Sequence, residues 1–520
     1  MIGRGSLVSP DAQVVGGGHG HAVVIGSSLA GLTAAQALAN FMDRVTVIER
    51  DWVPRGPGRR RGVPQARHTH TLTASAHRGL EELFPGIGRE LTAAGAVRVR
   101  MPEDMLLLGP GGWLPRDGAD LSVLSASRDL IDAAIRDRLR ADPKVSFLQE
   151  HEAVGLEPGR NDTVTGVWVR GRDRKAPEGW AARRLVSAEF VVDASGRGSR
   201  APQWLTEIGY QPPLETVAGA RTSCATALFA PPVGHVADWK SLFLMASPDN
   251  PRQGVLHPVE GGRWSVTVSA QDGERPPTDH EGLLRAAGAL RHPLLREVIE
   301  VATPLGPVYG SSGTENRWRH YEQLRRWPDQ FLVVGDALAA LDPAHGQGMT
   351  LAVQCALVLD QMLISHGTAV GITYRLRRAL AHRLAPAWQL STRNPYAAGD
   401  GQDAPTGLRA RLGRRYADRL AAAATTDPSA AALLIDALHT GTPTSGGLRP
   451  RVLLAALRGP AAQAGTVVPS TTHGPGGRRR RSSAPDAPVI GVSTGSTRSR
   501  ITGSSAQWPS PAPAGDRRGS

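Results

Sequence analysis

Short, uninterrupted runs of apolar residues recur at three places along this chain, and each run ends in a loop that carries glycine or aspartate. Strands that are covered on both faces in a parallel sheet show this continuous hydrophobicity. The pattern therefore predicts three buried parallel strands with loops of similar chemistry at their ends. The runs are Ala22–Ile25, Phe190–Val192 and Phe331–Val334.

In other segments the apolar residues follow a different spacing. Apolar and polar residues alternate in Trp264-x-Val266-x-Val268, as in an antiparallel strand with one wet face. Residues 405–458 have apolar residues four positions apart, which is typical of helices. We find no internal repeat. The chain is therefore predicted to be an α/β protein with three parts: a Rossmann-like, mostly parallel nucleotide-binding layer, an interleaved domain with an antiparallel sheet, and C-terminal helices.

The first apolar run leads into Gly26-Ser27-Ser28-Leu29-Ala30-Gly31, an Ala-rich helical segment to Asn40, and a second strand at Val45–Ile48. This order is the βαβ dinucleotide fingerprint, with Ser28 in place of its second glycine. Gly26 permits the tight turn, Gly31 lets the helix pack closely on the sheet, and the helix N-terminus offers N–H groups to a pyrophosphate. Glu49 ends the second strand, 23 positions after Gly26, where a carboxylate would bind the adenosine ribose. The alternative is a plain tight turn, but the surrounding strands and helix favour nucleotide binding.

Composition narrows the class of protein. The 520 residues can bury a large core, 40% of them are hydrophobic, and no stretch reaches the roughly eighteen continuous apolar residues of a membrane helix. The first twenty residues contain no apolar h-region, so no signal peptide is expected. Cys224 and Cys355 are the only cysteines, which suits a reducing cytoplasm and excludes a disulfide framework. We therefore expect a cytoplasmic protein without a transmembrane segment.

The formal net charge of +13 does not by itself indicate a nucleic-acid surface. Residues 461–520 contribute +6 of it through eight arginines and two aspartates, and the remainder is spread over the other 460 residues. This tail is rich in Ser, Gly and Pro, so we expect it to be disordered. The basic run Arg478–Arg481 within it is interpreted as part of a solvated linker, with docking on an anionic surface as the alternative. No nucleic-acid partner is expected.

Two further loops follow the second and third apolar runs. The second loop is Val191-Val192-Asp193-Ala194-Ser195-Gly196; the third combines Gly335-Asp336-Ala337 with Asp342-Pro343-Ala344-His345-Gly346-Gln347-Gly348-Met349. In this order and spacing the loops resemble those of FAD-dependent monooxygenases of the p-hydroxybenzoate hydroxylase type. The stretches Arg60–His68 and Pro386–Leu390 look closer still to bacterial flavin epoxidases and hydroxylases of secondary metabolism, relatives of squalene epoxidase. The resemblance covers about residues 21–458.

The resemblance implies roles for these loops in holding FAD. Asp336 looks like the carboxylate that binds a ribityl hydroxyl, and Asp193 resembles the aspartate of a loop shared between the pyrophosphate and a pyridine nucleotide. Gly346 to Met349 would place a helix N-terminus against the flavin edge where negative charge builds on reduction. Arg61, or alternatively Arg60, matches an arginine near the pyrophosphate, and Gly62-Val63 would contact the flavin ring through the backbone. The FAD-contacting residues expected on this basis are Gly26, Ser28, Ala30, Gly31, Glu49, Arg50, Arg61, Val63, Arg128, Asp193, Asp336, Pro343, Gly346, Gly348 and Met349.

Ser127 and Arg128 begin an amphipathic helical segment, with Ser127 as a suitable N-cap. Arg128 resembles the arginine that faces the flavin at this helix start in the family. The alternative is an exposed arginine paired with Asp132, four residues later.

The predicted organisation has five parts. They are a disordered tail at 1–20, a discontinuous FAD-binding domain at 21–200 and 305–404, a substrate domain at 201–304, C-terminal helices at 405–458 and a disordered basic tail at 459–520.

Other kinds of site are less well supported. His68, His70 and His77 suggest a metal site, and on a strand His68 and His70 would face the same side. No cysteine or carboxylate pattern nearby completes a tetrahedral ligand set, so no metal is expected, and a histidine that lines the flavin or substrate cavity is the alternative. The chain also lacks the close cysteine pair of disulfide reductases and the Trp-x-Trp signature of flavin halogenases.

These patterns favour an FAD-dependent monooxygenase that passes one oxygen atom of O₂, through a flavin C4a-hydroperoxide, to a small hydrophobic or aromatic substrate by epoxidation or hydroxylation. Electrons would come from NADPH or NADH, directly or through a separate flavin reductase. Because the cofactor carries this chemistry, no catalytic side chain is assigned. The alternatives are an FAD-dependent alkene reductase of the geranylgeranyl-reductase type and a non-catalytic protein that binds nucleic acid or membrane through its basic tail. The pattern does not identify the substrate, the electron donor or the oligomeric state.

Overall fold

A computed structural model describes residues 20–117, 121–176, 179–247, 249–271, 274–392 and 408–440. The predicted tails, up to residue 19 and from residue 459, lie outside the described residues, as does the basic run Arg478–Arg481.

The predicted buried strands form one parallel sheet. β1 lies in its middle, paired in parallel with β12 on one side and with β2 on the other. The chain runs from β1 to β2 and β8 on one side, and later from β12 to β19 on the other, so the strand order reverses between β1 and β12. Ligands of open α/β sheets bind at such a switch point, outside the carboxyl ends of the strands. In spatial order the strands are β19 (Phe331–Val333), β12 (Phe190–Asp193), β1 (His21–Ile25), β2 (Arg44–Ile48) and β8 (Val145–Leu148).

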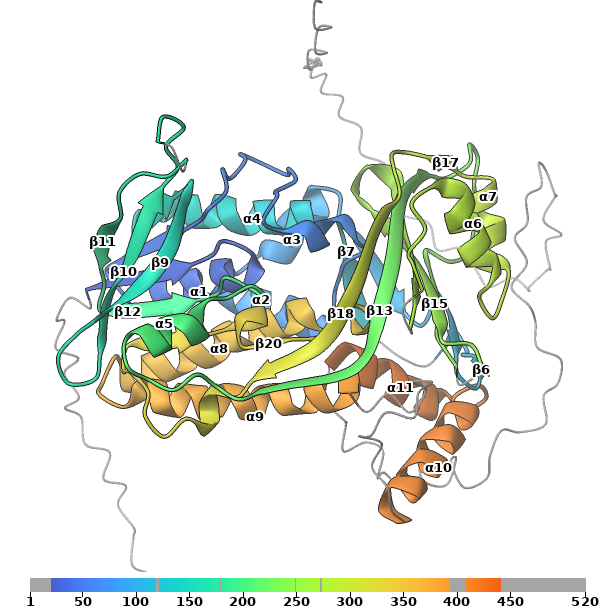
Figure 1. Cartoon of the computed structure of the whole chain (residues 1–520). Coiled ribbons are helices and arrows are strands. Elements are labelled where there is room, and N and C mark those ends of the chain that lie inside the picture. The colour runs from blue at the N-terminus through green and yellow to red at the C-terminus, as the bar shows by residue number, and fades with distance from the viewer. Residues whose placement is uncertain are drawn as a thin grey trace, which may run out of the picture. The chain divides into compact units, whose positions relative to one another are not determined.

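Helices cover this sheet and form the main core with it. α1 and α8 pack against each other, and α2 and α9 also pack on α8 (Figure 1). In the described part of the chain α8 alone is long and apolar enough to cross a membrane, but more than half of its apolar window is buried, as in the core helix of a globular fold. The helices of this layer are α1 (Leu29–Ala39), α2 (Ala74–Leu83), α3 (Ile87–Ala93), α4 (Arg128–Ala141), α5 (Ala201–Glu207), α8 (Gly348–His366) and α9 (Ile372–Thr392).

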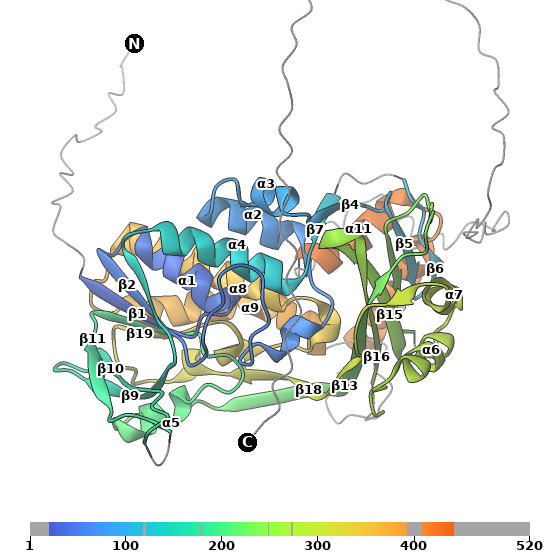
Figure 2. The same ribbon diagram turned by 90° about the horizontal axis from the view of Figure 1, so that it is seen from above.

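A second, largely antiparallel sheet is built around two long paired strands, β13 and β18, that run between the two halves of the described fold (Figures 1 and 2). Val266 and Val268 of β16 face a core formed with helices α6 (His280–Gly288) and α7 (Leu294–Glu300), so the predicted antiparallel alternation is confirmed. The expected wet face is wrong, because Ser265 and Ser269 on the other face are buried. The strands are β20 (Ala339–Ala340), β18 (Tyr309–Arg319), β13 (Glu215–Ala230), β16 (Arg263–Ala270), β15 (Arg252–Val259), β14 (Ser241–Leu244), β5 (Met105–Gly109) and β6 (Gly112–Trp113), with β17 (Thr303–Pro304) paired to β13.

Two small antiparallel sheets and two C-terminal helices complete the described fold. One sheet comprises β11 (Arg184–Ser187), β10 (Val164–Gly171) and β9 (His151–Pro158), and the other β3 (Thr71–Leu72), β7 (Leu121–Ser125) and β4 (Val97–Met101). The predicted C-terminal helices are present as α10 (Leu408–Ala423) and α11 (Pro428–Thr440), and residues 441–458 lie outside the described residues. Alanines of α10 and α11 pack on β4 and β5 in a separate apolar cluster.

The observed layers confirm the predicted fold class, a parallel α/β layer joined to an antiparallel sheet and C-terminal helices. The large sheet takes strands from several parts of the chain, including β5 before residue 201 and β18 after residue 304. The domain boundaries given above stay a prediction.

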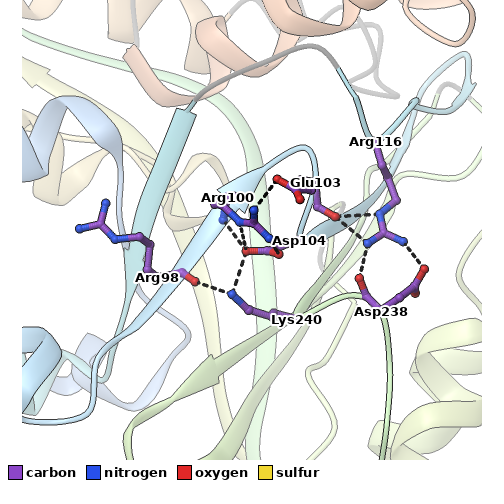
Figure 3. A network of polar contacts seen from close by, with 7 residues as sticks. All are labelled: Arg98, Arg100, Glu103, Asp104, Arg116, Asp238 and Lys240. Carbon is purple, nitrogen blue, oxygen red and sulfur yellow. Dashed lines mark hydrogen bonds and ion pairs between the residues drawn. The ribbon is translucent and has the colours of Figure 1, made fainter. Parts of the chain in front are cut away.

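A polar network holds β5 beside β14 in the large sheet (Figure 3). The carboxylate of Asp104, which is 5% exposed, accepts hydrogen bonds from Nη2 of Arg100 at 3.0 Å and from Nζ of Lys240 at 2.9 Å. Burial would raise the pKa of Asp104, but the hydrogen bonds from Arg100 and Lys240 hold it well below its usual range. Asp238 lies in the same network as the partner of Arg116, but its side chain is 82% exposed.

We expect Asp104→Asn to lower the free energy of unfolding, because two partly buried charge-assisted contacts lose their anion. Since the pKa is held low in the folded state, this contribution is complete above the ordinary aspartate pKa of about 4 and is lost as the pH falls further. Urea denaturation at neutral pH and at about pH 3 measures both effects. Asp238→Asn is the matched control and should change little; equal losses in the two variants would contradict the assignment.

Candidate functional site

The loops that follow β1, β12 and β19 meet at the carboxyl edge of the parallel sheet. Ile25 and Asp193 are opposite each other at the ends of β1 and β12, and the N–H of Val334 donates to the carbonyl of Asp193 at 2.9 Å. Gly26 has φ +96°, and a Cβ there would lie 2.7 Å from the carbonyl oxygen of Ala194. The structure therefore brings all three predicted loops together.

Two more glycines allow this close packing. A Cβ on Gly31 would lie 1.8 Å from the carbonyl oxygen of Gly26, and one on Gly335 would lie 2.6 Å from Cβ of Ala30. No side chain fits at either position without moving the backbone or the neighbouring helix. The first and third loops are thus in direct contact, and the packing role that we predicted for Gly31 agrees with this geometry.

Glu49 is buried at the end of β2 and contacts the first loop. Its Oε2 accepts from the N–H of Ser27 at 2.9 Å and is ion-paired with Arg60, while its Oε1 accepts from the N–H of Asp51 at 3.0 Å. Burial alone would raise the pKa of Glu49, but the charge of Arg60 and the hydrogen bonds from Asp51 and Ser27 lower it overall. The carboxylate is therefore ionised at neutral pH, as a ribose-binding acceptor needs to be.

Arg60, and not Arg61, is the arginine that lies against the first loop. Arg60 is 8% exposed and donates from Nη1 to the carbonyl of Ser27 at 2.7 Å, whereas Arg61 is exposed. The alternative that named Arg60 has the better geometry for contact with a pyrophosphate.

The contacts of Arg128 agree in part with each of its two interpretations, an arginine that faces the flavin and an arginine paired with Asp132. Its Nε donates to Asp132 at 2.7 Å, as the structural alternative expected, but the pair is buried and not exposed. Its Nη2 donates to Oγ of Ser28 at 2.8 Å, so Arg128 also reaches the phosphate loop. Ser127 caps α4 as predicted, since its hydroxyl accepts from the N–H of Leu130 at 3.1 Å.

The two loop aspartates have different surroundings. Asp193 is fully buried, and its carboxylate accepts from the N–H of Ser195 at 2.9 Å and from the hydroxyl of Ser199 at 2.5 Å. Burial raises the pKa of Asp193, and these hydrogen bonds oppose the rise. Asp193 therefore stabilises its own loop.

Asp336 is partly exposed, and none of the described residues donates a hydrogen bond to its carboxylate. Its enclosed position raises the pKa, while the positive charges of Arg197 and Arg128 lower it. A carboxylate that is enclosed and lacks donors is costly unless a ligand supplies them. This is the environment expected for an acceptor of hydroxyl groups.

The turn before α8 is held in place by the large sheet. Asp342 accepts from the hydroxyl of Thr222, and its N–H donates to the side chain of Asn316 at 2.8 Å. α8 then begins at Gly348 without a side-chain cap, and Gly346 at φ +64° and Gly348 are both exposed. The first N–H groups of an uncapped helix have no intrahelical partner and can bind an electron-rich group.

The other predicted contacts lie on the same side of the fold. Val63 and Met349 are buried, and Pro343 is exposed at the start of the turn before α8. Arg50 is exposed, and its Nε lies 3.7 Å from the position of a Cβ on Gly62. Direct contact of each residue with FAD stays a prediction.

The premise that His68 and His70 share a strand is wrong, because β3 begins only at Thr71. His68 Nδ1 lies 2.9 Å from Oγ1 of Thr226, whereas His70 Nε2 lies 2.8 Å from the carbonyl of Gln65. Burial and the charge of Arg128 lower the pKa of His70 to about 3, so this histidine is neutral at physiological pH.

Our sequence interpretation missed Arg319 and the position of Asp342. Arg319 is buried at the end of β18 and donates to the carbonyls of Ala337 and Arg197, which joins the second and third loops. No local pattern identifies it, because its partners are distant in sequence. The pair Asp342-Pro343 does carry a local signal, an N-cap residue followed by proline, and Asp342 caps this turn through Ala344.

The residues present fit a flavin dinucleotide. The start of α1 has no side-chain cap hydrogen bond, Asp336 offers an acceptor without a donor among the described residues, and α8 begins without a side-chain cap. In the described part of the chain no group of three or more His, Cys, Asp or Glu side chains could hold a metal ion.

Comparisons with known proteins agree with this geometry. A family model described as FAD binding domain matches residues 20–394. Protein Rv3254 of Mycobacterium tuberculosis is 32% identical over 387 residues, which cover 72% of this chain and 80% of that protein. Kynurenine 3-monooxygenase of Salinispora tropica is 27% identical over 370 residues, which cover 66% of this chain and 72% of the enzyme.

A solved structure shows the same fold at lower identity. The flavin-dependent brominase Bmp2 superimposes with a TM-score of 0.58 at 15% identity, over 84% of this chain and 98% of the brominase. At this identity the similarity concerns the fold alone.

We predict that substitutions of Asp336 and of Asp193 have different effects on the stability of the apoprotein. Asp336→Ala should weaken FAD binding by about tenfold to a hundredfold, and it should leave the free energy of unfolding of the apoprotein unchanged or raise it, because the carboxylate has no donor to lose. Asp193→Ala is the matched control and should destabilise the apoprotein, because Ser195 and Ser199 lose their acceptor. Fluorescence titration with FAD and urea denaturation of the apoprotein measure both quantities. Similar destabilisation by the two substitutions would show that Asp336 has a structural role.

Proposed function

The chain belongs to the FAD binding domain family, which it shares with flavin monooxygenases, and is an FAD-dependent oxidoreductase; on this basis we propose that it inserts one oxygen atom of O₂ into a small hydrophobic or aromatic substrate. The observation that carries the proposal is the convergence of the three loops on the enclosed carboxylate of Asp336 and the uncapped start of α8. The reaction is an epoxidation or a hydroxylation in a cytoplasmic enzyme of secondary metabolism.

The residues of the site divide the binding of FAD among them. The N–H groups at the start of α1, together with Arg60, would hold the pyrophosphate, and Glu49 would hold the ribose. Asp336 would accept hydrogen bonds from the ribityl chain, and Val63 and the segment from Gly346 to Met349 would hold the ring system. When bound, FAD supplies the two-electron chemistry and the reaction with O₂.

The protein supplies charge and position. The positive end of α8 would stabilise negative charge on a bound flavin ring, and its N-cap residue makes no side-chain cap hydrogen bond. Asp342 ties the preceding turn to Thr222 and Asn316 on the large sheet, so contacts within the protein position this helix end. Such preorganisation avoids a reorganisation cost during the reaction.

Electrons come from NADPH or NADH, either directly or through a separate flavin reductase. The residues that we assign bind and orient the cofactor, and none of them acts as a nucleophile. The reaction therefore depends on FAD content, and variants that lose FAD lose activity in proportion.

Incubation of the holoenzyme with NADPH, ¹⁸O₂ and a set of phenols and alkenes should give a product that carries one ¹⁸O atom, measured by mass spectrometry. Asp336→Ala, assayed at an FAD concentration that saturates only the unmodified enzyme, should give little labelled product. A saturated, unlabelled product that also forms without O₂ would refute oxygen transfer and indicate an alkene reductase.

A further inference from the structure

A pocket of about 430 Å³ lies beside the parallel sheet, and we call it the edge pocket. Its lining combines residues of β1, β2 and β8 with residues of β11 from one of the small antiparallel sheets. β8 and β11 are each the last strand of their sheet, so the pocket lies between two sheet edges. None of its lining residues is among those that we expect to contact FAD.

Two arginines, Arg44 of β2 and Arg184 of β11, line the edge pocket, and both are exposed. Within the described residues neither guanidinium has a hydrogen bond, an ion pair or a ring contact. The lining contains no carboxylate, and the carboxylate of Glu189 lies instead against Gly20. Two positive charges that border the same pocket repel each other, and a bound anion removes this repulsion. The charge of the edge pocket therefore favours an anionic ligand.

A row of hydrogen-bonded polar side chains also lines the edge pocket. Nδ1 of His21 lies 2.7 Å from the carbonyl oxygen of Ser187, so this nitrogen carries the proton. Nε2 of His21 lies 2.8 Å from Oγ1 of Thr46, which lies 3.2 Å from Oγ of Ser146. Burial lowers the pKa of His21 more than the hydrogen bond to Ser187 raises it, so the neutral Nε2 accepts the hydroxyl proton of Thr46. Ser146 at the end of this row is exposed, and its hydroxyl can donate to a ligand.

Apolar side chains complete the lining. Leu185, the neighbour of Arg184 in β11, is 37% exposed, and Phe147 and Leu148 of β8 are partly buried. An organic group bound beside the arginines would remove this apolar surface from water, which an inorganic ion alone would not do. The edge pocket thus offers polar groups to an anion and apolar surface to a carbon skeleton, a combination typical of small-molecule sites.

The length of the strands separates the edge pocket from the proposed flavin site. Arg44 begins β2, and Glu49 directly follows the end of this strand, five residues later. Because a strand rises about 3.3 Å per residue, the two residues are roughly 16 Å apart along the backbone. In the same way His21 begins β1, and Gly26 follows its end. A ligand of the edge pocket would therefore not compete with FAD for the phosphate loop.

We propose that the edge pocket is a second binding site, which takes a small organic phosphate. Arg44 and Arg184 hold the phosphate group, Ser146 donates a hydrogen bond to it, and the carbon part of the ligand lies against Leu185. A guanidinium presents two parallel N–H donors to a phosphate, and the three terminal oxygens of a phosphate monoester can serve two guanidinium groups at once. A carboxylate has one charge and two oxygens, so it binds more weakly. Because the ligand joins β2 to β11, its binding also stabilises the folded protein.

The test compares phenyl phosphate, benzoate and phenol as ligands of the FAD-saturated protein by isothermal titration calorimetry at pH 7.5, where phenyl phosphate is a dianion. We expect phenyl phosphate to bind with one-to-one stoichiometry, at least tenfold more tightly than benzoate, and to raise the Tm without changing the flavin absorbance spectrum. Phenol should not bind to this pocket. Absence of phenyl phosphate binding, or equal binding of benzoate, would overturn the proposal. The measurement needs no turnover, so its failure is distinct from failure of the ¹⁸O₂ experiment.

Variants locate the bound phosphate. Arg44→Gln and Arg184→Gln should each weaken phenyl phosphate binding at least tenfold while the FAD content stays unchanged, because each removes one cation from the edge pocket and none from the flavin site. Arg183→Gln is the matched control, since Arg183 precedes Arg184 but stacks over the ring of Trp168, 4.9 Å from its centroid; it should change the affinity less than twofold. Unchanged affinity in both variants of the pocket would place the ligand elsewhere and contradict the assignment. An equal loss in Arg183→Gln would also contradict it, because attraction to the general positive charge would then explain the binding.

Discussion

The close approach of backbone segments at the carboxyl edge of the parallel sheet is the constraint on which the site depends. Gly31 lies so near the carbonyl of Gly26 that a Cβ would be 1.8 Å from the oxygen, and a Cβ on Gly335 would be 2.6 Å from Cβ of Ala30. These contacts set the positions of α1 and of the turn that carries Asp336. The phosphate loop and the turn that carries Asp336 therefore lie side by side at this edge of the sheet.

The three carboxylates of the site, Asp193, Glu49 and Asp336, differ in the hydrogen bonds that they accept. Asp193 and Glu49 have their own donors and hold the loops in shape, whereas Asp336 is enclosed near Arg197 and Arg128 without a hydrogen bond from the described residues. Asp193 thus stabilises its own loop, Glu49 contacts the first loop and stays ionised, and Asp336 has no hydrogen-bond donor among the described residues. The three carboxylates differ because their local donors differ.

The large sheet contributes to the site from the other side. Through Thr222 and Asn316 it fixes the turn before α8, and through Thr226 it contacts His68. One face of this sheet packs on α6 and α7, so its strands are held firmly while the opposite face remains polar. The large sheet and the loops of the candidate site are thus coupled by direct contacts.

The local pattern of apolar and polar residues was sufficient to predict much of this architecture. Continuous apolar runs determined the parallel strands, alternation determined β16, and the spacing from Gly26 to Glu49 determined the first βαβ unit, because these features depend on residues that are near in sequence. The N-cap of α4 by Ser127 also depends on residues that are near in sequence. Tertiary structure decided the rest: that Arg60 and not Arg61 meets the first loop, that Arg319 joins the second and third loops, and that His68 meets Thr226. The contacts of Arg60 with Ser27, of Arg319 with Arg197 and of His68 with Thr226 join residues more than thirty positions apart, and no local periodicity encodes which side chains meet once the sheets have packed.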